Sequence, residues 1–252
     1  MAPFPRYDVL GTGVHALSLA QARDLLVGLR GRRGCGGVYP TTVHGVSEAL
    51  DDPALRAAHR RALLVTPDGM PLVWLGPGGV ERVYGPDLLL ATCDAGRAVG
   101  LRHYFYGGAP GVAERLRDRL TARFPGLEVV GTFTPPYREL TDDEFAALAA
   151  DVAAKRPDLV WVGLGSPKQE KFADAAAPRL EAAALVTVGA AFDFLSGRVP
   201  QAPAWMRRTG LEWLHRLATE PRRLWRRYLV LNPLFVVRVL AQLTGLRRYP
   251  RD

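Results

Sequence analysis

Short apolar runs alternate along the chain with longer stretches in which apolar residues recur every three or four positions. The runs are rich in β-branched and aromatic residues and cover residues 37–41, 62–69, 102–108, 127–131, 158–165 and 184–194. The stretches between them have the period of amphipathic helices and cover residues 18–29, 44–61, 87–100, 111–124, 141–155 and 168–183. This alternation predicts right-handed crossovers and an α/β fold, a Rossmann-like, mainly parallel sheet with helices on both faces.

The strand ends carry the residues of chemical interest. The apolar runs give way to the sequences "TPDG", "YGG", "GLGSP" and "VGAAFD". In a doubly wound sheet these are carboxyl-end loops, where ligands bind beside helix N-termini. We therefore expect several candidate residues to meet at one edge of the sheet.

Asp68 is the sharpest candidate, because "LLVTPDGMP" places a carboxylate directly after an apolar strand. Such an acid can act as a general base. An acid in a β-turn or a helix cap is the competing interpretation. Asp193, between two phenylalanines at the end of the last apolar run, has the same two readings: it could bind a sugar hydroxyl or cap a turn.

Two glycine-rich turns could hold an anionic ligand. In "GLGSPKQEKF" a turn leads into a helix that carries Lys168 and Gln169 near its start, where backbone N–H groups favour an anion or a sugar. Gly107 and Gly108 would let a diphosphate approach the backbone, and a tight turn explains them equally well.

Several other classes of site have no support in the sequence. There is no Walker loop, no complete GxGxxG fingerprint, no GxSxG elbow and no DxD sequence. Cys35 and Cys93 lack metal-ligand spacing, and His44 has no evident nucleophile partner. We expect no metal and no cofactor. The N-terminus lacks the layout of a signal peptide, which predicts a cytoplasmic protein.

The charge divides the chain into two parts. Twelve arginines and three acidic residues give residues 198–252 a net charge of +9, so residues 1–197 carry about −1 of the total of +8. We therefore predict an α/β core over 1–197 and a basic helical appendage over 198–252 with an anionic partner. Arg216, Arg223 and Arg226 would share one face of an unbroken helix, but Pro221 predicts a break and a second helix start.

The apolar run over residues 228–237 is interrupted by Asn232-Pro233 and is too short to cross a bilayer. It could lie in a membrane interface, with its arginines on anionic headgroups and Leu229, Leu231, Leu234 and Phe235 below them. A helix packed on its own domain or on another subunit is the alternative. A nucleic-acid-binding protein is a further alternative, since the pI is near 9.9 and arginines are clustered with aromatic residues, although no nucleic-acid-binding motif is present.

The order and content of the motifs resemble the TagA/WecG/CpsF glycosyltransferases, family 26, over nearly the whole chain. The resemblance rests on "PDGMP" followed by "YGPDLL", on "YGG", on "VGLGSPKQEKF", on "VGAAFDFLSG", on "APAWMRRTGLEWLHRL" and on "EPRRLWRRY".

The resemblance implies an inverting, metal-independent enzyme that moves an N-acetylmannosamine-type sugar from UDP to a polyprenyl-diphosphate-linked sugar. Asp68 matches the family's catalytic base and Gln169 its active-site glutamine. Arg216, Arg223 and Arg226 match arginines of a C-terminal appendage that closes over the nucleotide diphosphate and engages the membrane. The implied location is the inner face of the cell membrane, and a homo-oligomer is left open.

Two positions differ from the family's usual pattern. Thr42 stands where an asparagine is common, and Gln201 stands in place of an arginine. Both lie near the expected sugar pocket, so the donor sugar stays open. A catalytically idle scaffold with the same fold is the remaining alternative.

Overall fold

The structure is a computed structural model of the 252-residue chain and describes residues 4–250, with only the backbone described for Arg208, Arg223 and Arg227. The strands are β1 (Arg6–Val9), β2 (Thr12–His15), β3 (Gly36–Thr41), β4 (Leu64–Pro67), β5 (Arg102–Gly107), β6 (Glu128–Phe133), β7 (Leu159–Gly163) and β8 (Ala184–Thr187). The core helices are α1 (Leu19–Val27), α2 (Val43–Asp51), α3 (Pro53–Arg61), α4 (Met70–Leu75), α5 (Gly85–Gly96), the short η1 (Arg97–Val99), α6 (Val112–Arg123), α7 (Asp142–Lys155), α8 (Lys168–Ala176) and α9 (Ala191–Leu195).

Within residues 4–250, strands β3 to β8 form one six-stranded sheet in the order β4-β3-β8-β7-β5-β6, and every neighbouring pair is parallel. This confirms the predicted α/β fold. The order places the loop after β4 at one edge and the loops after β8, β7 and β5 successively across the sheet.

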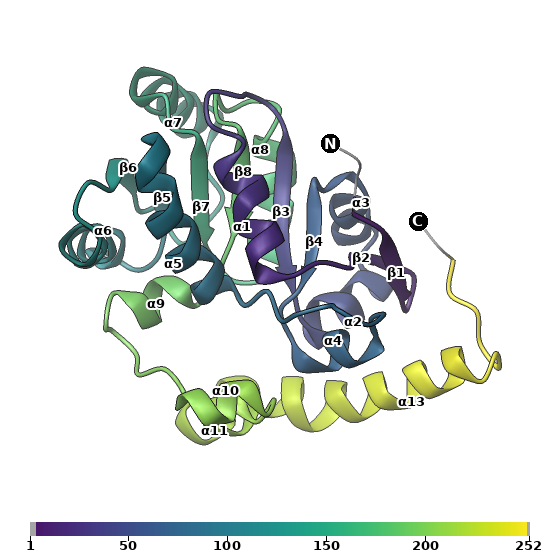
Figure 1. Cartoon of the computed structure of the whole chain (residues 1–252). Helices are drawn as coiled ribbons and strands as arrows, with labels where there is room; N and C mark the ends of the chain where they lie inside the picture. The colour runs from purple at the N-terminus through teal and green to yellow at the C-terminus, as the bar shows by residue number, and fades with distance from the viewer. Residues whose placement is uncertain (1–3, 251–252) are drawn as a thin grey trace.

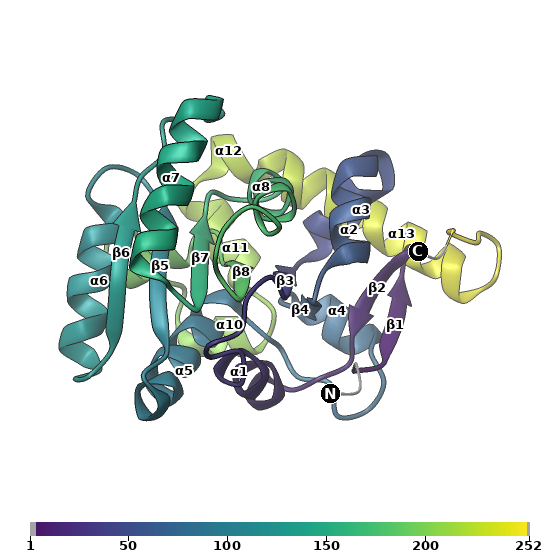
Figure 2. The same cartoon turned by 90° about the horizontal axis from the view of Figure 1, so that it is seen from above.

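Helices cover both faces of this sheet (Figures 1 and 2). Viewed from above, α2, α3, α8 and α7 lie along one face and α1, α5 and α6 along the other. Each face has its own buried cluster: Val46, Leu148 and Val152 lie in one, and Leu26, Leu88 and Leu116 in the other. The two clusters hold the strands rigidly, which fixes the loops at their carboxyl ends.

Three local predictions were wrong or incomplete. The pattern missed the antiparallel hairpin β1–β2, whose strands have four residues each. The predicted helix over 44–61 is two helices, because the Asp52 carboxylate accepts from the N–H groups of Ala54 and Leu55 and Pro53 starts α3. The predicted strand over 184–194 ends at Thr187, and Asp193 lies in helix α9.

The C-terminal appendage is helical, as predicted. It contains α10 (Ala204–Arg208), α11 (Glu212–Thr219), α12 (Pro221–Trp225), the π-helical turn η2 (Arg226–Leu231) and α13 (Asn232–Leu243). The break at Glu220-Pro221 and the new start at Pro221 are both present. The π turn ends at Leu231, two residues before Pro233, whose missing N–H removes a donor from the α-helical hydrogen-bond ladder.

The appendage crosses the end of the molecule where α2 and α4 begin and then returns to the N-terminal hairpin (Figure 1). Phe235 and Val239 are buried in the same cluster as Val9 and Leu10. The Gln242 side chain donates to the Asp8 carboxylate at 3.0 Å and accepts from the Leu10 N–H at 2.8 Å. Phe235 therefore faces the protein, which corrects its predicted place on the membrane side.

Within residues 4–250, no helix combines the length and the apolar character that crossing a bilayer requires.

Candidate active site

Asp68 lies directly after β4, at the carboxyl edge of the sheet. Its backbone N–H donates to the Thr41 carbonyl at 2.9 Å, which ties this loop to the end of β3. The carboxylate receives one long backbone contact, from the N–H of Gly85 at 3.5 Å, and one side-chain contact, from Arg82 Nη2 at 3.2 Å. The side chain is 15% exposed, so the carboxylate is largely buried and has few donors.

Burial raises the pKa of Asp68 to about 6, the Arg82 charge opposes that rise, and the nearby Glu212 charge adds to it. At neutral pH the carboxylate is therefore mostly ionised, yet it binds a proton far more readily than an ordinary aspartate. These are the properties of a general base that works near neutral pH.

Arg82 is the centre of a network that the sequence did not predict. Its Nη2 also donates to Glu212 Oε2 at 2.8 Å, its Nη1 donates to the Arg207 carbonyl at 2.9 Å, and its Nε donates to the Asp68 carbonyl. Its guanidinium lies 4.1 Å from the centre of the Tyr84 ring. Two of its partners belong to the appendage, so Arg82 joins the appendage to the loop of Asp68.

Gln201 enters the same network through Tyr84. The Gln201 amide donates to the Tyr84 hydroxyl at 3.2 Å, and that hydroxyl donates to Glu212 Oε1 at 2.8 Å. Gln201 thus lies two contacts from Arg82, through the hydroxyl and the ring of Tyr84. Thr42 is the other departure, and it lies between β3 and α2, close to Gly69 of the Asp68 loop.

Gln169 is buried and braces two carboxyl-end loops. Its Oε1 accepts from the N–H groups of Gly165 at 3.2 Å and Gly189 at 2.9 Å, and its Nε2 donates to Glu170 at 2.9 Å. The side chain therefore holds the loop after β7 against the loop after β8. Lys168, one residue earlier, is exposed and lies 5.1 Å from the centre of the Tyr137 ring.

Gly107 and Gly108 form a tight turn between β5 and α6. Their φ angles are +122° and +77°. A Cβ at Gly107 would lie 2.6 Å from the Gly163 carbonyl oxygen, and one at Gly108 would lie 2.9 Å from the Val112 side chain. These contacts explain both glycines by close packing of the chain, while a role in diphosphate binding stays a prediction.

Asp193 and Arg216 line a pocket of about 180 Å³ between α9 and the appendage. Asp193 forms an ion pair with Arg198 at 3.0 Å. The Arg216 guanidinium lies 5.9 Å from the Phe194 ring, and its buried Nε has no hydrogen-bond partner in the described part of the chain. The pocket thus combines a carboxylate with an available guanidinium donor.

The three predicted appendage arginines are placed differently. Arg216 lies on α11 and lines this pocket, whereas Arg226 follows the break at Pro221 and is exposed. The side chain of Arg223 lies outside the described residues. The structure therefore brings Arg216 to the carboxyl edge beside Asp193.

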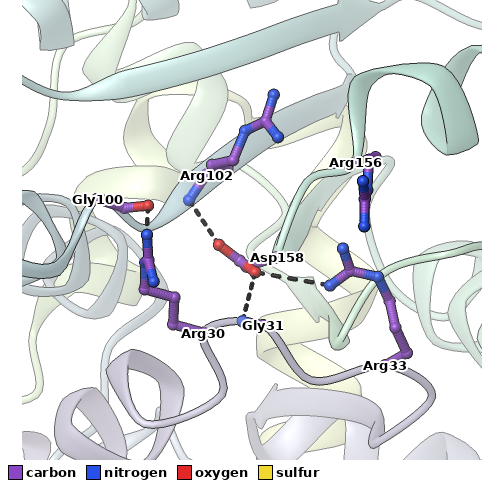
Figure 3. Close-up of a pocket in the computed structure, with 7 residues that line it drawn as sticks. All are labelled: Arg30, Gly31, Arg33, Gly100, Arg102, Arg156 and Asp158. Atoms are coloured by element: carbon purple, nitrogen blue, oxygen red, sulfur yellow. Dashed lines mark hydrogen bonds and ion pairs between the residues drawn. The ribbon is translucent and has the colours of Figure 1, made fainter.

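A second pocket lies at the opposite, amino edge of the sheet (Figure 3). It measures about 170 Å³ and is lined by Arg30, Gly31, Arg33, Gly100, Arg102, Arg156 and Asp158. The buried Asp158 carboxylate accepts from the N–H groups of Gly31 at 2.8 Å and Arg102 at 2.9 Å, and lies 3.6 Å from Arg33. Both oxygens of this carboxylate therefore accept a backbone hydrogen bond, and the side chain connects three chain segments.

Within residues 4–250, no group of three or more His, Cys, Asp or Glu side chains is arranged to hold a metal ion.

Most of the chain is similar to known proteins. The model of the glycosyl transferase WecG/TagA/CpsF family matches residues 7–249. An N-acetylglucosaminyldiphosphoundecaprenol N-acetyl-beta-D-mannosaminyltransferase from Bacillus spizizenii is 34% identical over 200 residues, which cover 77% of this chain and 74% of that protein. A protein of the same name from Bacillus subtilis is 30% identical over 162 residues, 64% of this chain and 60% of that protein. Since the family model spans the core, the carboxyl-edge loops and the appendage alike, this chain belongs to the WecG/TagA/CpsF family of glycosyltransferases.

Proposed function

We propose that this glycosyltransferase moves an N-acetylhexosamine-type sugar, N-acetylmannosamine or a derivative, from UDP to a polyprenyl-diphosphate-linked sugar. The reaction inverts the anomeric centre and needs no metal. The names of the two relatives support the sugar and the lipid-linked acceptor. The product would serve the biosynthesis of a cell-surface polysaccharide.

The observation that carries this proposal is the setting of Asp68. The acceptor hydroxyl gives its proton to the Asp68 carboxylate as its oxygen bonds to the anomeric carbon, and the bond from that carbon to the UDP oxygen breaks with its electron pair. A single displacement of this kind inverts the configuration. The pKa of about 6 suits a base that takes a proton from a hydroxyl only as the new bond forms.

The leaving diphosphate needs positive charge near it, and the pocket of Asp193 and Arg216 offers both a carboxylate and a guanidinium. In the proposal, Asp193 accepts hydrogen bonds from hydroxyl groups of the UDP-sugar. Arg216, with Arg223 and Arg226, stabilises the negative charge that grows on UDP. Lys168, Gln169, Gly107, Gly108, Thr42 and Gln201 complete the predicted donor site. Arginines would here take the place that a divalent cation has in metal-dependent sugar transfer.

A lipid-linked acceptor requires a membrane, and the appendage has a surface suited to one. Its exposed apolar side chains include Trp225, Leu229, Val237, Leu240 and Leu243, all between 48% and 69% exposed. Exposed leucines and valines beside arginines favour the interface of an anionic bilayer over nucleic acid, which offers phosphates to the arginines and no apolar phase to the aliphatic side chains. We place the enzyme in the cytoplasm, peripherally on the inner face of the membrane.

The test is sugar transfer in EDTA by the purified protein, with a panel of UDP-N-acetylhexosamines and a short-chain lipid-diphosphate sugar. Turnover with one donor, and its loss in the Asp68→Asn variant, is the expected result. Equal transfer by the variant would overturn the assignment of the base, and a strict need for added Mg²⁺ would overturn metal independence. UDP binding without turnover across the panel would favour the idle scaffold or a different donor.

A further inference from the structure

The appendage and the catalytic loop share one guanidinium group. Arg82 Nη2 contacts Asp68 Oδ1 at 3.2 Å and Glu212 Oε2 at 2.8 Å, so a single nitrogen serves two carboxylates. Glu212 belongs to α11 of the appendage, whereas Asp68 and Arg82 belong to the core. Their side chains are 11%, 15% and 18% exposed, respectively, so the shared contact is largely screened from water.

The rest of the contact also crosses between core and appendage. Arg82 Nη1 reaches the carbonyl of Arg207 at the end of α10, and the second oxygen of Glu212 accepts from Tyr84 at the entrance to α5. The Gly85 N–H, next to Tyr84, is the backbone donor nearest to the second oxygen of Asp68. Seating α10 and α11 on the core therefore fixes both sides of the Asp68 carboxylate.

We propose that Glu212 is a positioning residue that couples the seating of the appendage to the basicity of Asp68, through the guanidinium group that the two carboxylates share. This inference deepens the proposed function and rests on the role of Asp68 in it. With the appendage seated, Glu212 takes part of the Arg82 charge and Asp68 keeps its affinity for a proton. Without Glu212, Arg82 Nη2 pairs with Asp68 alone. It then stabilises the ionised form of the Asp68 carboxylate and makes it less basic.

The charges around Asp68 make this coupling specific. Arg82 and Glu212 are the two side-chain charges that move the pKa of Asp68, and they move it in opposite directions. Other titratable or charged side chains on the elements around this loop include Asp87, Cys93 and Asp94 of α5, His44, Glu48 and Asp51 of α2, Arg207 of α10, and His215 and Arg216 of α11. Asp87 and Arg207 pair with each other at 3.4 Å, and His44 lies 3.7 Å from Glu48. Glu212 is thus the appendage group that can act on Asp68 by charge.

The matched variants are Glu212→Gln and Asp87→Asn. Each keeps the size of its side chain, and each removes one charge from the contact between core and appendage. Glu212→Gln should move the acidic limb of the pH profile of kcat/KM downward by about one pH unit, because it removes the negative charge that shares Arg82 Nη2 with Asp68 in a poorly solvated site. Asp87→Asn should leave the limb where it is. Arg82→Met removes the opposing charge and should move the limb upward.

A second readout needs no substrate. The carboxyl ¹³C resonance of Asp68, assigned by its absence in Asp68→Asn, is titrated in wild type, Glu212→Gln and Asp87→Asn. A lower pKa in Glu212→Gln alone supports the coupling even if no donor is ever turned over, which separates it from the proposed function. An unmoved Asp68 pKa in a folded Glu212→Gln variant, or the same movement in Asp87→Asn, would overturn the coupling and leave Glu212 as a structural contact.

Discussion

Asp68 and Asp158 are two buried aspartates at opposite ends of one sheet, with very different surroundings. Asp158, at the amino edge, accepts two backbone hydrogen bonds of 2.8 and 2.9 Å, and its side chain is 5% exposed. Asp68, at the carboxyl edge, has one backbone contact of 3.5 Å and shares its arginine with another carboxylate.

The difference shows what distinguishes a structural carboxylate from a reactive one. Backbone donors on both oxygens fix the position of a carboxylate and tie together the chain segments that supply them. Asp158 is held in this way and connects the α1–β3 loop, β5 and β7. Asp68 is buried with few donors, and burial raises its pKa to about 6, a value that suits the general base we propose.

The largest expected effect is on the rate of sugar transfer, when Asp68 is replaced. Asp68→Asn should lower the rate of sugar transfer by about 10²- to 10⁴-fold, since it removes the proton acceptor. Steady-state UDP release measures this, and Asp158→Asn is the matched control.

The same substitution should not lower the stability of the fold at neutral pH. Burial raises the folded-state pKa of Asp68 above its unfolded value, so its contribution to stability is greatest below pH 4 and is lost as the pH rises through about 6. Asp68→Asn should therefore be at least as stable as wild type at pH 7 in urea unfolding. A large loss of stability would show that Asp68 is a structural residue like Asp158.

Replacing Asp158 should lower the stability of the fold and leave turnover unchanged. Asp158→Asn leaves one of two buried N–H groups without an acceptor, and we expect it to lower the free energy of unfolding by about 2–4 kcal/mol. Turnover per folded molecule should stay at the wild-type value. Urea unfolding and active-site-normalised kinetics measure the two quantities, and a loss of turnover without a loss of stability would refute the division of roles.

The smallest expected effect lies on the appendage. Val237→Glu places a charge on an exposed apolar position of α13 and should weaken cosedimentation with anionic vesicles severalfold, because that residue would enter the interface. Ala122→Glu, an exposed position on α6, is the control. Equal cosedimentation of the two variants would move the membrane contact away from α13.

The sequence predicted the sheet well because each of its six strands is an apolar run bounded by Gly, Pro or Asp. It also predicted Asp68, since a carboxylate after a buried strand is a local pattern. The hairpin β1–β2 was missed because its short strands mix apolar and polar residues. The break in residues 44–61 was missed although Asp52-Pro53 is a common helix start.

Other features depend on contacts that no local pattern contains. Arg82 and Glu212 are 130 residues apart, and their pairing appears only in the folded chain. Glu212 is one of three acidic residues in the arginine-rich segment 198–252, and this contrast of charge was the available signal for it. Phe235 lies in a segment that is apolar on all sides, so only the packing against Val9 and Leu10 decides which side faces the core.

The most direct test of the central claim is the pH dependence of kcat/KM for sugar transfer by the wild-type protein between pH 4.5 and 8. With Asp68 as the general base, the rate should be constant above about pH 7, pass through an acidic limb near pH 6 and fall about tenfold for each pH unit below it. A rate that stays constant down to pH 4.5 would contradict a proton transfer to Asp68.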